Sequence, residues 1–129
     1  MHEYCHYLTL NNGQVDYGGQ PTYGCYAESD LAARPNSYLN VFYQTFWTDY
    51  LDDRLADPET YGFYLRHSDD FLTSYAATSP SEDIAESFAY FVLYDQAKEE
   101  GLQAQKQNFF YAYPELVTFR DQARARMGL

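Results

Sequence analysis

Residues 1–6 read Met1-His2-Glu3-Tyr4-Cys5-His6, which is a complete H-E-x-x-H motif. On a helix, His2 and His6 lie one turn apart on the same face. Two imidazoles placed in this way can hold one zinc ion, and the glutamate beside the first can act as general base toward a zinc-bound water. An exposed helix with scattered polar residues is the simpler alternative. The motif predicts a zinc site with Glu3 as its base, and a third protein ligand has to come from further along the sequence.

The composition limits the classes of function. A chain of 129 residues fits one domain that can bury a real core. Nineteen acidic residues against eight basic ones give a formal net charge of −11, which argues against nucleic-acid binding through a basic patch and against adhesion to anionic membranes. No apolar run is long enough to predict a transmembrane helix.

The chain after the motif predicts a helix over residues 2–10 that ends at Asn11-Asn12-Gly13. Residues 11–36 are rich in glycine and turn-forming residues, so we expect a long loop on the active-site side, with room for a short hairpin. The tyrosines of this region are Tyr7, Tyr17, Tyr23 and Tyr26. They either line a substrate groove or pack the loop onto the body of the protein, and packing is the favoured interpretation.

Residues 38–55 carry apolar and aromatic side chains at spacings of three and four, which predicts one amphipathic helix with Ser37 as its N-cap. The acidic residues along and just after this helix are Asp49, Asp52, Asp53 and Asp57. A solvated acidic face explains them better than a metal cluster does. Residues 58–80 show a less regular pattern. Toward the C-terminus, a short aromatic helix is predicted over residues 102–112 and a last helix from Pro114 onward.

A second informative stretch runs from Ser79 to Leu93. Ser79 as N-cap, Pro80 at the first helical position and Glu82 at the third make a capping-box pattern. Glu82 and Glu86 lie one turn apart, so both can face the motif helix. Glu82 could also serve only as the capping-box partner, because acidic residues favour the first turn of any helix. The need for a third zinc ligand favours a glutamate here, and the residues alone leave Glu82 and Glu86 open.

The other metal-binding residue types are weaker candidates. His67 is the only further histidine, and its spacing does not fit the compact three-histidine pattern, so we interpret it as a surface or capping residue. On a helix, Cys5 points away from the face that carries the two motif histidines. Cys5 and Cys25 either pair as a disulfide or remain two thiols.

The motif, the Tyr75…Glu82-x-x-x-Glu86 segment and the ending Tyr113-Pro-Glu-Leu116 together resemble a known family. The chain is similar to the bacterial zinc-binding metallopeptidases related to the catalytic domain of anthrax lethal factor, within the gluzincins. The resemblance covers residues 2–6, 37–51 and 75–93, and more weakly 105–120. It implies a mainly α fold, the zincin-like catalytic half built from the H-E-x-x-H helix and the helices downstream of it.

The resemblance implies a role for each matching residue. The three zinc ligands would be His2, His6 and Glu82. Glu3 would be the general base, and Tyr75 would stabilise the oxyanion of the tetrahedral intermediate or assist the leaving group. Glu86 would be an outer-shell carboxylate, the usual partner of the second ring N–H of a ligand histidine.

In this family the motif follows an upstream half with a small β-sheet, whereas here it begins at residue 2. We therefore expect residues 1–129 to be a single zincin-like domain that lacks most of that sheet, as a fragment of a longer protein or a truncated form. The expected function is zinc-dependent hydrolysis of a peptide or protein substrate. The alternative is a catalytically inactive zincin-like scaffold that acts as a binding module. The acidic composition and the toxin-like kin favour an extracellular or cell-surface location.

Overall fold

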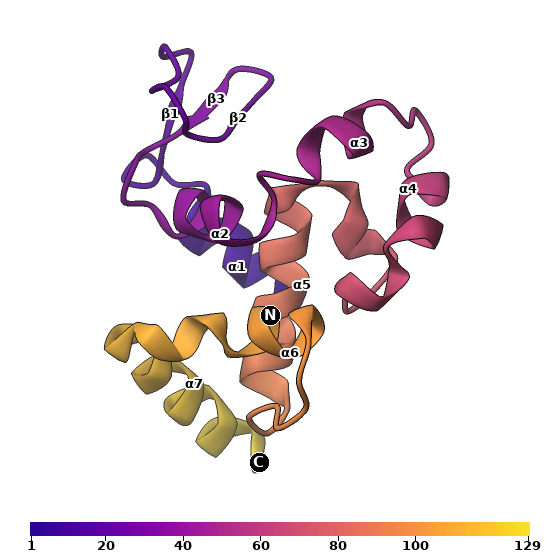
Figure 1. Ribbon diagram of the computed structural model, residues 1–129. Coiled ribbons are helices and arrows are strands. Elements are labelled where there is room, and N and C mark those ends of the chain that lie inside the picture. Colours follow the sequence, from indigo (N-terminus) through magenta and orange to yellow (C-terminus); the bar gives the residue numbers. More distant parts are fainter.

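The computed structural model describes all of residues 1–129, and the fold is mainly α, as the sequence predicts (Figure 1). The α-helices are α1 (His2–Thr9), α2 (Tyr38–Phe46), α3 (Leu51–Leu55), α4 (Tyr61–Arg66), α5 (Pro80–Leu93), α6 (Leu102–Asn108) and α7 (Pro114–Met127). The 3₁₀ helices are η1 (Ser68–Asp70), η2 (Tyr75–Thr78) and η3 (Phe109–Ala112). Helix α5 runs through the middle of the molecule, and α1, α2, α6, α7 and η2 all contact it.

A small antiparallel sheet occupies part of the stretch that the sequence predicts to be a long loop. Its strands are β1 (Val15–Tyr17), β2 (Ala27–Glu28) and β3 (Leu31–Ala33), in the order β1-β3-β2. Strands β2 and β3 form the short hairpin for which the prediction left room, and the pairing of β1 with β3 was not predicted. Strands of two or three residues are too short to show an alternating pattern in the sequence.

The four tyrosines near this sheet do not share one role. Tyr26 is buried, and Tyr17 donates a hydrogen bond to the carbonyl of Leu10 at 2.7 Å. The side chains of Tyr7 and Tyr23 are exposed. Packing onto the body of the protein is therefore confirmed for Tyr26 and does not describe Tyr7 or Tyr23.

The single helix predicted over residues 38–55 is wrong, because a turn separates α2 from α3. Ser37 caps α2 as predicted, since its hydroxyl accepts the N–H of Asn40 at 3.1 Å. Trp47 ends α2, is fully buried and donates its indole N–H to Asp83 on α5 at 2.9 Å. The apolar spacing continues through this turn, which is why the pattern alone predicts one helix.

Most other helix boundaries agree with the prediction. The hydroxyl of Ser79 accepts the N–H of Glu82 at 3.2 Å, so α5 begins at Pro80 with the predicted cap. Helix α7 begins at its predicted proline. The helix predicted over residues 102–112 is α-helical only as far as Asn108 and continues as η3.

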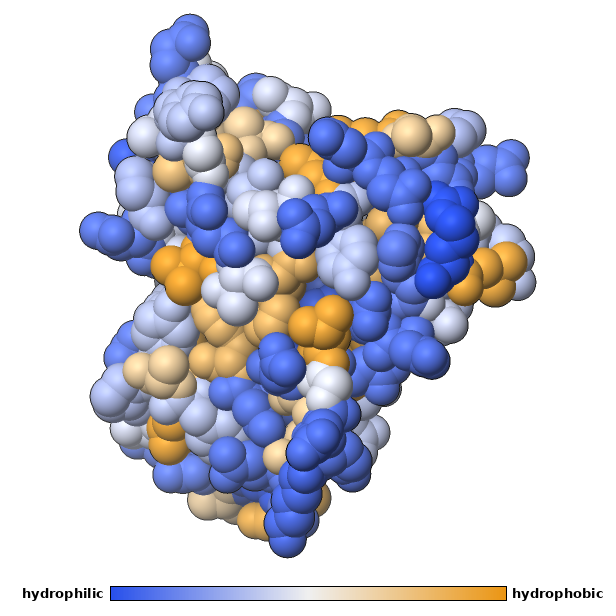
Figure 2. Space-filling model, viewed as in Figure 1, coloured by the Kyte–Doolittle hydropathy of each residue, from blue (hydrophilic) through white to orange (hydrophobic).

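The core is aromatic and centred on α5. The buried side chains of this helix include Ile84, Phe88, Phe91 and Val92, and each contributes roughly 1.5–3 kcal/mol when it leaves water. On the face drawn in Figure 2, hydrophilic residues cover most of the surface and hydrophobic residues gather near its centre. The longest helices, α5 and α7, have 14 residues each, and no helix combines the length and apolar character that crossing a membrane requires.

Candidate metal site

Two histidines of α1 and one glutamate of α5 bring their ligand atoms together where these helices pack. The Nε2 atom of His2 lies 3.0 Å from Nε2 of His6 and 3.0 Å from Oε2 of Glu82. The Nε2 atom of His6 lies 3.2 Å from Oε1 of Glu82. In a tetrahedral zinc site with bonds of about 2.0 Å, neighbouring ligand atoms are about 3.3 Å apart. The three side chains therefore have the spacing that one zinc ion needs.

The protein does not satisfy all the polar atoms of this cluster. The side chains of His6 and Glu82 are 20% and 17% exposed, and Nδ1 of His6 and Oε2 of Glu82 are buried without a hydrogen-bond partner. Leaving a buried polar atom unpaired costs roughly 1–3 kcal/mol. The Oε2 atom of Glu82 has no hydrogen-bond partner and lies 3.0 Å from Nε2 of His2, so a cation bound between them would stabilise it. The residues present thus fit a zinc ion.

Glu86 lies behind the cluster and orients His2. Its Oε2 atom accepts a hydrogen bond from Nδ1 of His2 at 2.9 Å. A neutral imidazole that donates through Nδ1 presents the lone pair of Nε2, which is the atom that faces Glu82. Of the two glutamates that the sequence left open, Glu82 therefore lies in the ligand position and Glu86 in the supporting one.

Thr73 completes this arrangement, and sequence reasoning missed it. Its hydroxyl donates to Oε1 of Glu86 at 2.8 Å and accepts the N–H of Ala76 at 3.1 Å. Thr73 thereby connects the carboxylate that holds His2 to the turn that carries Tyr75. The local sequence shows only a threonine before a turn, and that pattern does not predict a hydrogen bond to a residue of α5.

The two predicted catalytic side chains lie at the solvent-facing rim of the cluster. The side chain of Glu3 is 90% exposed, and its Oε1 atom is 3.9 Å from Nε2 of His2. The ring of Tyr75 is about half exposed, and its centroid is 5.7 Å from that of the His2 ring. The negative charge of Glu82 raises the pKa of Tyr75, so the phenol keeps its proton at neutral pH and can donate a hydrogen bond.

No family model, curated protein or solved structure matches this chain. The similarity to the metallopeptidases related to lethal factor therefore stays a prediction that rests on the motif residues.

The weaker metal-ligand candidates have other contacts. His67 is the C-cap of α4, and its Nε2 atom lies 2.8 Å from Oδ2 of Asp53, which agrees with the predicted capping role. Cys5 is buried, its thiol donates to the carbonyl of Ile84 at 3.6 Å, and burial raises the pKa of that thiol. Cys5 and Cys25 are both free thiols.

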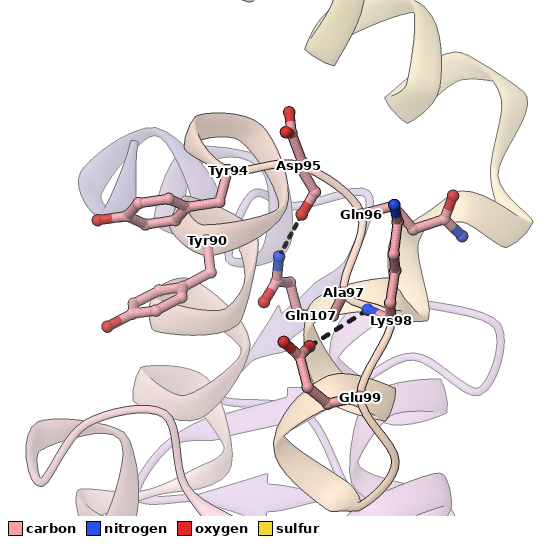
Figure 3. A pocket seen from close by; sticks show the side chains of 8 residues that line it. All are labelled: Tyr90, Tyr94, Asp95, Gln96, Ala97, Lys98, Glu99 and Gln107. Carbon is pink, nitrogen blue, oxygen red and sulfur yellow. Dashed lines mark hydrogen bonds between the residues drawn. The ribbon is translucent and has the colours of Figure 1, made fainter.

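A separate surface pocket lies at the other end of α5 (Figure 3). Tyr90 and Tyr94 project side by side from the end of that helix, and the amide of Gln107 donates to the carbonyl of Asp95 at 2.9 Å. At 1.5 Å per residue, Tyr94 is about 18 Å along the helix from Glu82. This pocket is lined by two carboxylates, Asp95 and Glu99, but by no histidine or cysteine. The group of three possible metal ligands in the structure is His2, His6 and Glu82, where α1 meets the start of α5.

Proposed function

We propose that this protein is a zinc-dependent metallopeptidase that hydrolyses a peptide bond in a peptide or protein substrate. One observation carries the proposal: the ligand atoms of His2, His6 and Glu82 lie close together, and Oε2 of Glu82 is buried there without a hydrogen-bond partner. A glutamate and a protonated tyrosine at the rim of this cluster are the residue types that a general base and an oxyanion donor require.

Hydrogen bonds among neighbouring residues orient one of the proposed zinc ligands, His2. His2, His6 and Glu82 would bind the zinc ion, and Glu86, itself bonded to Thr73, fixes the ring of His2. When bound, zinc supplies a Lewis acid that lowers the pKa of water and polarises a carbonyl group. An outer shell of this kind keeps the imidazole oriented and raises its basicity.

Two side chains would carry the proton and the developing charge. Glu3 is exposed on the rim, so its carboxylate can accept a proton from the attacking water and later deliver it to the leaving amine. Tyr75 donates its hydroxyl proton in a hydrogen bond to the oxygen of the scissile carbonyl, where negative charge develops.

Cleavage of a mixed fluorogenic peptide library by the zinc-loaded chain tests the proposal, with Glu3→Gln as the central variant. We expect Glu3→Gln to slow cleavage by roughly 10²–10⁴-fold, the usual contribution of a general base. Zinc content should not change, because Glu3 is not a ligand. Glu100→Gln removes the same charge from an exposed loop residue and should keep full activity. Cleavage that survives Glu3→Gln would contradict the assigned role.

A scaffold that binds zinc without turnover is the alternative function. It is favoured by the freedom of Glu3, whose side chain is 90% exposed and makes no hydrogen bond within the protein that would fix it over the cluster. In that case the wild-type chain would hold about one zinc ion and cleave no member of the library. The same experiment therefore separates the two functions.

A further inference from the structure

A pocket beside the candidate zinc site shares Tyr75 with it. This pocket has a volume of about 310 Å³ and is lined by Tyr61 and Tyr64 of α4, by Tyr75 of η2 and by Glu59. Tyr61 and Tyr75 are 64% and 53% exposed, in contrast to the many aromatic side chains that the core buries. Aromatic rings left open to solvent next to a reactive centre are available to a ligand.

The turn that carries Glu59 into this pocket has a strained backbone. Thr60 has a φ of 65°, a left-handed conformation that β-branched residues rarely adopt. Asp57 supports the turn, because its carboxylate accepts the N–H groups of Glu59 and Phe63 at 3.0 and 2.6 Å. Both oxygens of the Asp57 carboxylate thus accept backbone hydrogen bonds within the protein. The exposed carboxylate of Glu59 has no ion pair and accepts no hydrogen bond.

The nearby positive charges are already engaged. Arg66 pairs with Asp53 at 2.8 Å, and Arg54 donates to the carbonyls of Asp57 and Thr78 at 2.8 and 2.9 Å. Neither arginine lines the pocket. Glu59 therefore remains as a free negative charge beside three tyrosine rings.

Three tyrosine rings and one free carboxylate line this pocket, and they match the chemistry of a guanidinium group. Arginine stacks on aromatic rings and forms paired hydrogen bonds with a carboxylate. A formal net charge of −11 also favours the approach of basic peptides. We propose that this pocket binds an arginine side chain of the substrate near the bond to be cleaved and so selects basic peptides. The inference rests on the proposed metallopeptidase function.

Peptide binding to the zinc-loaded Glu3→Gln chain tests the inference, because this variant is expected to bind without turnover. Two capped peptides differ only in arginine or citrulline, its uncharged isostere, and calorimetry measures the affinity of each. We expect the arginine peptide to bind about tenfold more tightly or better, the factor for one charge-assisted contact. Adding Glu59→Gln should remove this preference, Tyr61→Ala should weaken binding of the arginine peptide, and Glu100→Gln should change neither.

The outcome is separable from that of the proposed function. A chain that holds zinc but cleaves nothing still reports the preference for arginine, and a chain that holds no zinc reports it in the metal-free form. Equal affinity for the two peptides, absence of binding by both, or a preference that survives Glu59→Gln overturns the pocket assignment. Each of these results leaves the zinc and cleavage measurements to decide the metallopeptidase proposal on their own.

Discussion

Glu82 and Asp83 are neighbours in the first turn of α5, and their carboxylates have opposite surroundings. Asp83 is fully buried and lies 2.9 Å from the indole N–H of Trp47, 2.9 Å from the ammonium of Lys106 and 3.3 Å from the hydroxyl of Ser87. The Oε2 atom of Glu82 is buried without a hydrogen-bond partner and lies 3.0 Å from Nε2 of His2, and its Oε1 atom lies 3.2 Å from Nε2 of His6. A satisfied network holds the fold together, whereas an unsatisfied buried cluster points to a ligand that completes it.

The network of Asp83 fixes the part of α5 from which Glu82 projects. Lys106 is fully buried, donates to the carbonyl of Asp70 at 2.6 Å and lies 3.9 Å above the ring of Phe71. It thereby joins α6, η1 and the start of α5. Asp83 is thus assigned to stability and its neighbour Glu82 to metal binding, so substitutions can test the two roles separately.

The largest effect on stability is expected from Lys106→Met. This change leaves the Asp83 carboxylate buried without its cation, and breaking a buried pair from one side costs about 3–5 kcal/mol. The free energy of unfolding, measured by urea denaturation, should fall by that amount. The double variant Asp83→Asn with Lys106→Met should recover part of the loss, because no uncompensated charge remains.

Lys98→Met is the matched control, since Lys98 is exposed and its ammonium makes no ion pair. We expect it to change stability by less than about 0.5 kcal/mol. If Lys106→Met lowers the free energy of unfolding no more than Lys98→Met does, the stabilising role assigned to the Asp83 network is wrong.

A smaller effect, on zinc binding, is expected from Glu86→Gln. The substitution keeps the shape of the side chain but removes the charge that accepts the Nδ1–H of His2. Outer-shell partners of this kind typically contribute 10–100-fold to metal affinity, so zinc affinity should fall by about tenfold or more. Competition with a chromogenic chelator measures this change, and Glu100→Gln should leave the affinity at the wild-type value. If Glu86→Gln changes zinc affinity no more than Glu100→Gln does, Glu86 does not support the zinc site.

The smallest effect is expected from Thr73→Val, which keeps the volume and removes the hydroxyl. The lost hydrogen bond to Glu86 is worth about 1 kcal/mol, so zinc affinity should fall by roughly fivefold. The same competition assay measures it. Thr45→Val is the control, because the Thr45 hydroxyl bonds only within its own helix, to the carbonyl of Val41. An unchanged affinity in Thr73→Val would show that Thr73 does not support the site.

The parts of the site that were predictable from the sequence depend on local spacing. The two histidines of the motif lie one turn apart on any helix. The start of α5 is marked locally, by Ser79 as N-cap and Pro80 at the first helical position. The placement of Glu82 against the histidines depends on how α1 packs on α5. The residues alone left Glu82 and Glu86 open as the third ligand, and only the resemblance assigned that role to Glu82.

The parts that were missed depend on contacts between distant residues. Thr73 joins the site through a hydrogen bond to a residue 13 positions later. The turn between α2 and α3 coincides with the burial of Trp47 against Asp83, 36 positions away. The strands of the sheet are paired across a stretch that reads as loop because each is only two or three residues long. Periodicity cannot detect such contacts, since it describes one element at a time.

The affinity of the chain for zinc, with and without the Glu82 carboxylate, tests the central claim most directly. The geometry predicts one zinc ion per chain, and Glu82→Ala should weaken binding by more than the roughly 10–100-fold of an outer-shell partner. The unfolding curve of Glu82→Ala shows whether the fold is retained, so that loss of zinc can be assigned to loss of the ligand. A wild-type chain that binds no zinc, or a folded Glu82→Ala variant that binds it as tightly as the wild type, would contradict the account.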